Sequence, residues 1–167
     1  MNAVAYYSSP IGLIKMVAVG GELVSLRFAE VLEDDAQNEG FFKTFLGQLY
    51  HYFKGVDAAF PLSIHLAGTP FQQQVWQLLM QIPHGRTRSY EEMAIAMGDR
   101  KKIRAVANAI SRNPLPIVIP CHRVVGKNGD LTGYLGGLWR KQYLLDLEQI
   151  RTQPPLIPLV ATSSGHH

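Results

Sequence analysis

The sequence predicts an α+β fold in two parts: a small N-terminal sheet domain with one helix, and a mostly helical C-terminal domain that contains a helix-turn-helix. Three observations indicate this fold. Short runs of β-forming residues separated by turn residues fill the first half, and apolar residues recur at helical spacing through the second. A chain of 167 residues also suffices for two small domains. We expect domains at residues 1–67 and 68–150, followed by a tail at 151–167.

The N-terminal part is predicted to be a sheet covered by one helix. Ser9-Pro10-Ile11-Gly12 and the two-residue hairpin Gly20-Gly21 separate the first three strands. Apolar residues between 42 and 53 recur at helical spacing and predict a helix that ends near Gly55. The predicted strands cover residues 4–7, 13–19, 23–28 and 62–66. Nothing in this part suggests chemistry.

The C-terminal part begins with a strong signal for a helix. Thr69 is a preferred capping residue, Pro70 suits the first helical position, and Gln72 completes a capping box. We expect this helix to continue to about Ile82 and to bury one apolar stripe. The stripe consists of Phe71, Val75, Leu78, Leu79 and Ile82, with Trp76 packed beside it.

Two short helices follow, at 90–97 and at about 101–111, with Ser89 as the cap of the first and Gly98 between them. This arrangement, with basic residues on one face of the second helix, is typical of a helix-turn-helix. The face predicted to be buried consists of Ile103, Val106, Ala107 and Ile110. The face predicted to be exposed consists of Lys101, Arg104, Ala105, Asn108 and Arg112. Lysine and arginine neutralise phosphates, although a merely solvated helix face has the same pattern.

The only cysteine of the chain lies in the stretch 117–126, where we expect a buried strand to end. A thiol becomes a strong nucleophile as thiolate, which needs a nearby base or positive charge. His122 and Arg123 are the candidate suppliers. Because successive side chains of a strand point to opposite faces, Cys121 and His122 can meet only if the backbone turns between them. A cysteine in an apolar run can also be a small buried hydrophobe without chemistry.

The residues after the cysteine stretch predict a loop and a last helix. Three glycines surround Tyr134 in the segment 131–137, which suggests a flexible loop that forms one wall of a pocket. A final helix is expected from Leu138 to about Ile150, with Glu148 near its end. The closing residues 163–167 resemble the remnant of a purification tag, so their histidines are left out of metal arguments.

Composition excludes several classes of protein. No apolar run approaches the ~18 residues of a membrane span, no signal peptide is visible, and one cysteine makes neither an internal disulfide nor a cysteine-cluster zinc site. We therefore expect a cytoplasmic protein without metal or cofactor. Residues 1–85 carry four lysines and arginines against seven acidic residues, and residues 86–167 carry twelve against six. This asymmetry favours a polyanion-binding face on the C-terminal part.

Together these residues resemble the O6-alkylguanine-DNA alkyltransferases. The resemblance is carried by Pro120-Cys121-His122-Arg123-Val124-Val125-Gly126, with Arg104-Ala105-Val106 and Asn113-Pro114 before it and Gly133-Tyr134-Leu135-Gly136-Gly137 after it. Order and spacing agree from about Thr69 to Glu148. The resemblance implies a ribonuclease H-like N-terminal domain and a protein that takes an alkyl group from O6-alkylguanine in double-stranded DNA. O4-alkylthymine is implied as a further substrate.

The resemblance also implies roles for particular residues. Cys121 accepts the alkyl group, His122 deprotonates it through a water, and Glu148 orients the histidine. Asn113 supports the active-site loop, and Tyr90 meets the guanine N3 edge as both catalytic and DNA-contacting residue. The residues implied to bind the base are Val124, Tyr134 and Leu135. The residues implied to bind DNA are Lys101, Arg104, Ala105, Asn108 and Arg112, with Arg104 filling the gap left by the flipped nucleotide.

Two departures and two alternatives accompany this resemblance. Leu135 and Asn108 stand where relatives often have smaller residues, which bears on the alkyl groups accepted and on the fit to the DNA groove.

Because an alkyl-cysteine is a thioether that water does not cleave, each molecule is expected to react once. A damage sensor without repair activity and a cysteine hydrolase are the alternatives. We expect a monomer, and cooperative binding to DNA stays open.

Overall fold

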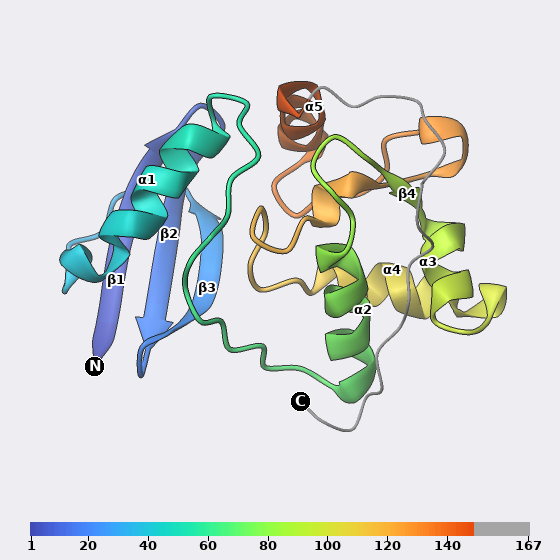
Figure 1. Ribbon diagram of the computed structural model, residues 1–167, viewed down its shortest axis with the longest axis horizontal. Coiled ribbons are helices and arrows are strands. Elements are labelled where there is room, and N and C mark those ends of the chain that lie inside the picture. The colour runs from blue at the N-terminus through green and yellow to red at the C-terminus, as the bar shows by residue number, and fades with distance from the viewer. Residues whose placement is uncertain (149–167) are drawn as a thin grey trace. The chain divides into compact units, whose positions relative to one another are not determined.

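The computed structural model describes residues 1–148 and divides into two compact units, Met1–Leu66 and one that begins at Ala67 (Figure 1). The predicted tail at 151–167 and the predicted helix end at Ile150 lie outside the described residues. The strands are β1 (Asn2–Ser9), β2 (Gly12–Val19), β3 (Glu22–Ala29), β4 (Arg88–Ser89) and β5 (Val124–Val125). The α-helices are α1 (Lys43–Tyr52), α2 (Pro70–Met80), α3 (Tyr90–Ala96), α4 (Ile103–Ser111) and α5 (Leu138–Leu147). Short 3-10 helices are η1 (Glu39–Phe42), η2 (Arg100–Lys102), η3 (Cys121–Arg123) and η4 (Lys127–Gly129).

The first unit is an antiparallel three-stranded sheet in the order β1-β2-β3, with α1 across one face (Figure 1). The turn between β2 and β3 requires positive φ at both residues, and glycines at 20 and 21 supply it with φ values of 60° and 84°. The three strands and the helix predicted from the sequence are therefore confirmed. The sheet and the helix share an apolar core. Its fully buried members include Ile14, Met16, Leu23, Leu26, Phe45 and Leu49.

The fourth strand predicted at 62–66 is wrong. This segment touches the sheet at a single bridge, where Ile64 lies beside Leu23. Two hydrogen bonds hold it, from Leu23 N–H to the Ser63 carbonyl at 2.8 Å and from His65 N–H to the Leu23 carbonyl at 3.0 Å. A strand needs a continued ladder, and the contact ends after one residue of β3. Alternating apolar residues therefore produced an edge contact without a strand.

The second unit is built on the packing of α2 against α4. The predicted capping box is present, because the Thr69 hydroxyl accepts from Gln72 N–H and the Gln72 side chain accepts from Thr69 N–H. Trp76 is buried and donates its indole N–H to the Ala109 carbonyl at 2.8 Å. This bond reaches a carbonyl near the end of α4 and joins the two helices.

Helices α3 and α4 form the predicted helix, glycine turn and helix. Ser89 caps α3 with a second capping box, and Gly98 ends it with φ of 108°, a value that side chains disfavour. The buried face of α4 differs from the prediction, because Ile103 is 38% exposed and Ala107 is only half-buried. Val106, Ala109 and Ile110 form the buried face instead. Ile103 and Ala107 line a cavity.

The parallel pair β4 and β5 brings two distant segments together. Arg88 pairs with Val124 and Ser89 with Val125. Tyr90 follows β4 directly as the first residue of α3, and η3 directly precedes β5. The short ladder therefore places the start of α3 beside the segment that holds the cysteine.

The buried strand predicted before Cys121 is wrong. Residues 115–120 make a tight turn, in which Ile119 N–H donates to the Leu115 carbonyl at 2.8 Å and Ile117 has a positive φ of 75°. Three prolines, at 114, 116 and 120, lack the N–H groups that a central strand would donate. Ile117 and Ile119 are buried, as predicted, but in a turn.

Candidate active site

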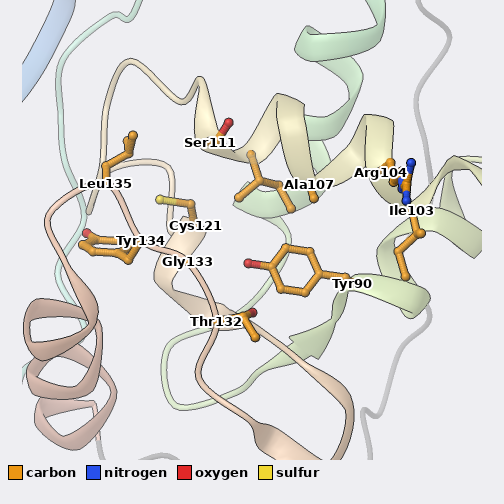
Figure 2. A pocket seen from close by; sticks show the side chains of 11 residues that line it. Tyr90, Ile103, Arg104, Ala107, Ser111, Cys121, Thr132, Gly133, Tyr134 and Leu135 are labelled. Atoms are coloured by element: carbon orange, nitrogen blue, oxygen red, sulfur yellow. The ribbon is translucent and has the colours of Figure 1, made fainter.

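A cavity of about 570 Å³ lies among α3, α4, η3 and the loop at 132–135 (Figure 2). Cys121 is in its wall and is 4% exposed. The Tyr90 hydroxyl points into the space between Cys121 and Thr132, whereas Arg104 lies at the other end (Figure 2). The lining residues are Tyr90, Ile103, Arg104, Ala107, Ile110, Ser111, Cys121, Thr132, Gly133, Tyr134 and Leu135.

The backbone turns at the cysteine. Cys121 and His122 lie in the 3-10 helix η3, held by Cys121 N–H donating to the Ile119 carbonyl at 2.7 Å and Arg123 N–H to the Pro120 carbonyl at 3.0 Å. The alternation expected of a strand therefore does not apply here. The thiol and the imidazole are adjacent on a turn, both buried.

The Cys121 thiol is protonated in the resting protein at neutral pH. Burial raises its pKa to about 11, and the Asn113 side chain, the Lys141 charge and the backbone N–H groups of Cys121 and His122 only partly offset this. The thiolate needed for nucleophilic attack must therefore be produced by removing a proton when the substrate is in place.

His122, Arg123 and Glu148 form a buried cluster. His122 Nε2 lies 2.6 Å from Glu148 Oε2. The Arg123 guanidinium donates to the same carboxylate twice, from Nε to Oε1 at 2.7 Å and from Nη2 to Oε2 at 3.0 Å. Its remaining nitrogen, Nη1, donates to the Ile82 carbonyl at 2.7 Å. Gly85 N–H adds a long contact to Glu148 Oε1 at 3.5 Å.

The charges in this cluster select one form of the histidine. Burial alone raises the pKa of Glu148, but the hydrogen bonds from His122 and Arg123 and the positive charge of Arg123 outweigh it and hold that pKa well below its usual range. Burial lowers the pKa of His122, against the opposing pull of Glu148. The ring is therefore neutral beside an ionised carboxylate, which only accepts hydrogen bonds. Nε2 carries the proton, and Nδ1 is the accepting nitrogen.

Asn113 braces the turn before the cysteine. Its Nδ2 donates to the Ile119 carbonyl at 2.8 Å, and its Oδ1 accepts from Leu115 N–H at 2.9 Å. The side chain is 4% exposed and also lowers the pKa of Cys121. Asn113 therefore links Leu115 and Ile119, the two ends of the turn that precedes Cys121.

The residues expected to bind the base lie around the cavity in part. Tyr134 and Leu135 line it, with Leu135 52% exposed at the rim. Burial raises the pKa of the Tyr134 hydroxyl well above its ordinary value, so that group stays protonated. Val124 is buried in β5, directly after η3, and its side chain is not among the lining residues.

The residues expected to bind DNA lie on η2, on α4 and directly after α4. Arg104 lines the cavity. All five are exposed: Lys101, Arg104, Ala105, Asn108 and Arg112.

Sequence reasoning missed two contributions to the site. Arg123 was a candidate supplier of charge to the thiol, but its guanidinium binds Glu148 and the Ile82 carbonyl. Lys141, in α5, is fully buried and donates to the carbonyls of the cavity loop. Lys141 lies three and four residues before Leu144 and Leu145, which places it on the same buried face of the helix. This spacing could have predicted the burial of Lys141 from the sequence.

Within residues 1–148, no group of three or more histidine, cysteine or acidic side chains is arranged to hold a metal ion. No helix in this part of the chain has the length and hydropathy needed to cross a bilayer.

The family models match both units. The model described as 6-O-methylguanine DNA methyltransferase, DNA binding domain, matches residues 70–150. The model described as 6-O-methylguanine DNA methyltransferase, ribonuclease-like domain, matches residues 3–66.

Relatives and solved structures agree over most of the chain. A methylated-DNA–protein-cysteine methyltransferase of Methanosarcina barkeri is 43% identical over 147 residues, which cover 84% of this chain and 93% of that protein. The crystal structure of Mycobacterium tuberculosis O6-methylguanine methyltransferase is 40% identical, covers 94% of this chain and 97% of its own, and has a TM-score of 0.79. A Mycobacterium tuberculosis protein solved in complex with DNA is 42% identical, with coverage of 86% and 91% and a TM-score of 0.79.

The fold and these matches define the class, a DNA-repair methyltransferase with a dedicated DNA-binding domain. The chain belongs to the methylated-DNA–protein-cysteine methyltransferase family, also described as the O6-methylguanine DNA methyltransferases. The resemblance inferred from the cysteine motif is confirmed.

Proposed function

We propose that this protein repairs O6-alkylguanine in double-stranded DNA by moving the alkyl group onto Cys121. The observation that carries the proposal is the position of the thiol: it lies in the wall of a cavity bordered by the DNA-binding helix α4, beside a histidine held by a buried carboxylate. A base enters such a cavity only after it leaves the duplex, so the reaction includes flipping of the damaged nucleotide.

The transfer is a displacement at the alkyl carbon. Nδ1 of His122 takes the thiol proton through a water, while Glu148 holds the ring by Nε2. The thiolate then forms a sulfur–carbon bond as the bond from that carbon to O6 of guanine breaks. The electron pair stays on the base, and the Tyr90 hydroxyl gives it a proton at N3.

Backbone groups read the flipped base. Backbone groups of Cys121, Val124 and Leu135 provide the hydrogen bonds, and Tyr134 forms the wall against which the base packs. Because Val124 acts through its backbone, its buried side chain does not conflict with this role. Leu135 at the rim limits the alkyl groups accepted, and O4-alkylthymine is proposed as a second substrate.

The exposed face of α4 binds the duplex through its minor groove. Arg104, at the edge of the cavity, enters the stack in place of the flipped nucleotide. Lys101 and Arg112 neutralise phosphates, and the small side chain of Ala105 permits close approach of the backbone. Asn108 contributes a larger polar contact to the groove. We propose that the protein works as a cytoplasmic monomer, alone or with further copies on the DNA.

The product explains why the reaction runs once. The alkylated cysteine is a thioether, which water does not hydrolyse. The chain has no second cysteine that could accept the alkyl group from Cys121. The protein is therefore a stoichiometric acceptor.

Intact-mass spectrometry after incubation with an O6-methylguanine duplex tests the proposal. We expect the mass to rise by one methyl group, located on Cys121 by peptide mapping, and no rise with undamaged duplex or with Cys121→Ser. Tight binding of the lesion without a mass gain would indicate a sensor, and turnover of acyl substrates would indicate a hydrolase; either would overturn the proposal.

A further inference from the structure

Lys141 is a buried cation in α5. Its side chain is fully buried, and no carboxylate within residues 1–148 forms an ion pair with it. Burying an ammonium without a counter-charge is costly. A methionine or leucine would fill the same place on the apolar face without that cost, so the charge itself needs an explanation.

The ammonium contacts the loop that forms one wall of the cavity. Nζ donates to the Thr132 carbonyl at 2.6 Å and lies 3.4 Å from the Gly133 carbonyl. It also lies 5.8 Å from the centre of the Tyr90 ring. Thr132 and Gly133 lead directly into Tyr134 and Leu135, and all four line the cavity. Lys141 thus ties α5 to the wall that faces the thiol.

The same ammonium interacts with the charges of the site. Burial lowers the pKa of Lys141 to about 8, and a thiolate on Cys121 opposes this shift. In return, Lys141 lowers the pKa of Cys121. It also lowers the pKa of His122, which favours the neutral ring that can accept a proton. Titratable groups near the ammonium therefore include Cys121 and His122 from η3 and Tyr90 from α3.

We propose that Lys141 is a positioning residue of the transfer reaction, which holds the 132–133 backbone at the cavity wall and supplies the buried positive charge that favours the Cys121 thiolate. The role in transfer rests on the proposed function. The effect on the thiol does not, because it is a property of the protein without DNA.

The test measures alkylation of Cys121 by iodoacetamide in the full chain, without DNA, from neutral to alkaline pH. Lys141→Met keeps the length of the side chain and removes its charge, and Lys141→Arg keeps the charge. Near pH 7 we expect the Met variant to react roughly tenfold more slowly than the parent protein, because the thiolate loses a nearby positive charge. The Arg variant should recover most of this loss. Lys127→Met, which changes an exposed lysine, should react like the parent.

The pH profile separates the charge from a structural effect. The ammonium helps only while it is protonated, so its benefit is present below its pKa of about 8 and is lost as the pH rises through that value. The ratio between parent and Met variant should therefore shrink above pH 8, whereas arginine does not titrate there. A Met variant that folds and reacts at the parent rate near pH 7, or a ratio that stays constant with pH, would overturn the inference. The methyl-transfer experiment with lesion DNA decides the proposed function separately.

Discussion

Replacing Glu148 by alanine should lower the free energy of unfolding by about 3–5 kcal/mol, the range found when one partner of a buried ion pair is removed. Glu148 accepts two hydrogen bonds from Arg123 and one from His122, all in the interior. Without it, the Arg123 guanidinium is left as a buried charge with a single carbonyl partner. Urea denaturation followed by circular dichroism measures the loss.

The double variant Arg123→Met with Glu148→Leu is the matched control. It removes both charges and fills the space with apolar groups, so it should be more stable than Glu148→Ala alone. Because the depressed pKa of Glu148 stabilises the fold above the ordinary carboxyl range, acid should weaken the parent as pH falls and the Glu148→Ala variant less so. A loss below about 1 kcal/mol, the scale of an exposed pair, would show that the cluster does not support the fold.

Replacing His122 by alanine should slow methyl transfer at neutral pH by about 10²–10⁴-fold, the usual contribution of a positioned base. The thiol has a pKa of about 11 because of its burial, so little thiolate forms unaided near pH 7. The deficit should shrink as the pH rises, since solvent then removes the proton. Single-turnover rapid-quench kinetics with a lesion duplex measure the rate at each pH.

His122→Gln distinguishes the base from a structural group. Its amide can donate to Glu148, as Nε2 does, but it does not take a proton at these pH values. We expect this variant to keep more of the stability than His122→Ala and to show the same deficit in rate. A rate close to that of the parent protein in His122→Gln would remove His122 from the role of base.

Local signals were sufficient for much of the fold. Thr69 and Ser89 each predict the start of a helix through a capping box, and the structure contains both boxes. Gly20-Gly21 predicts a tight hairpin turn, and both residues have positive φ there. These features depend on a few neighbouring residues, so the sequence shows them directly. The buried strand predicted around Ile117 was wrong. The apolar residues of this segment indicated burial, but its prolines prevent the hydrogen bonding of a central strand.

Contacts between distant residues could not be predicted from local pattern. The bond between His122 and Glu148 spans 26 positions, and only the family resemblance paired them. Lys141 was missed because charged residues are normally at the surface. Arg123 was assigned to the wrong partner, because its position next to Cys121 in the sequence does not determine which groups its guanidinium contacts. Ile103 was predicted to be buried because it follows the helical period of the apolar residues. In the structure it lines the cavity and is partly exposed.

Counting repaired lesions per protein molecule tests the central claim most directly. An O6-methylguanine duplex in large excess is incubated with a known amount of protein until methyl loss from the DNA stops. If Cys121 is the acceptor and the thioether is permanent, the count reaches one per molecule and remains there, and Cys121→Ser gives none. A count that continues past one, or repair by Cys121→Ser, would contradict the account.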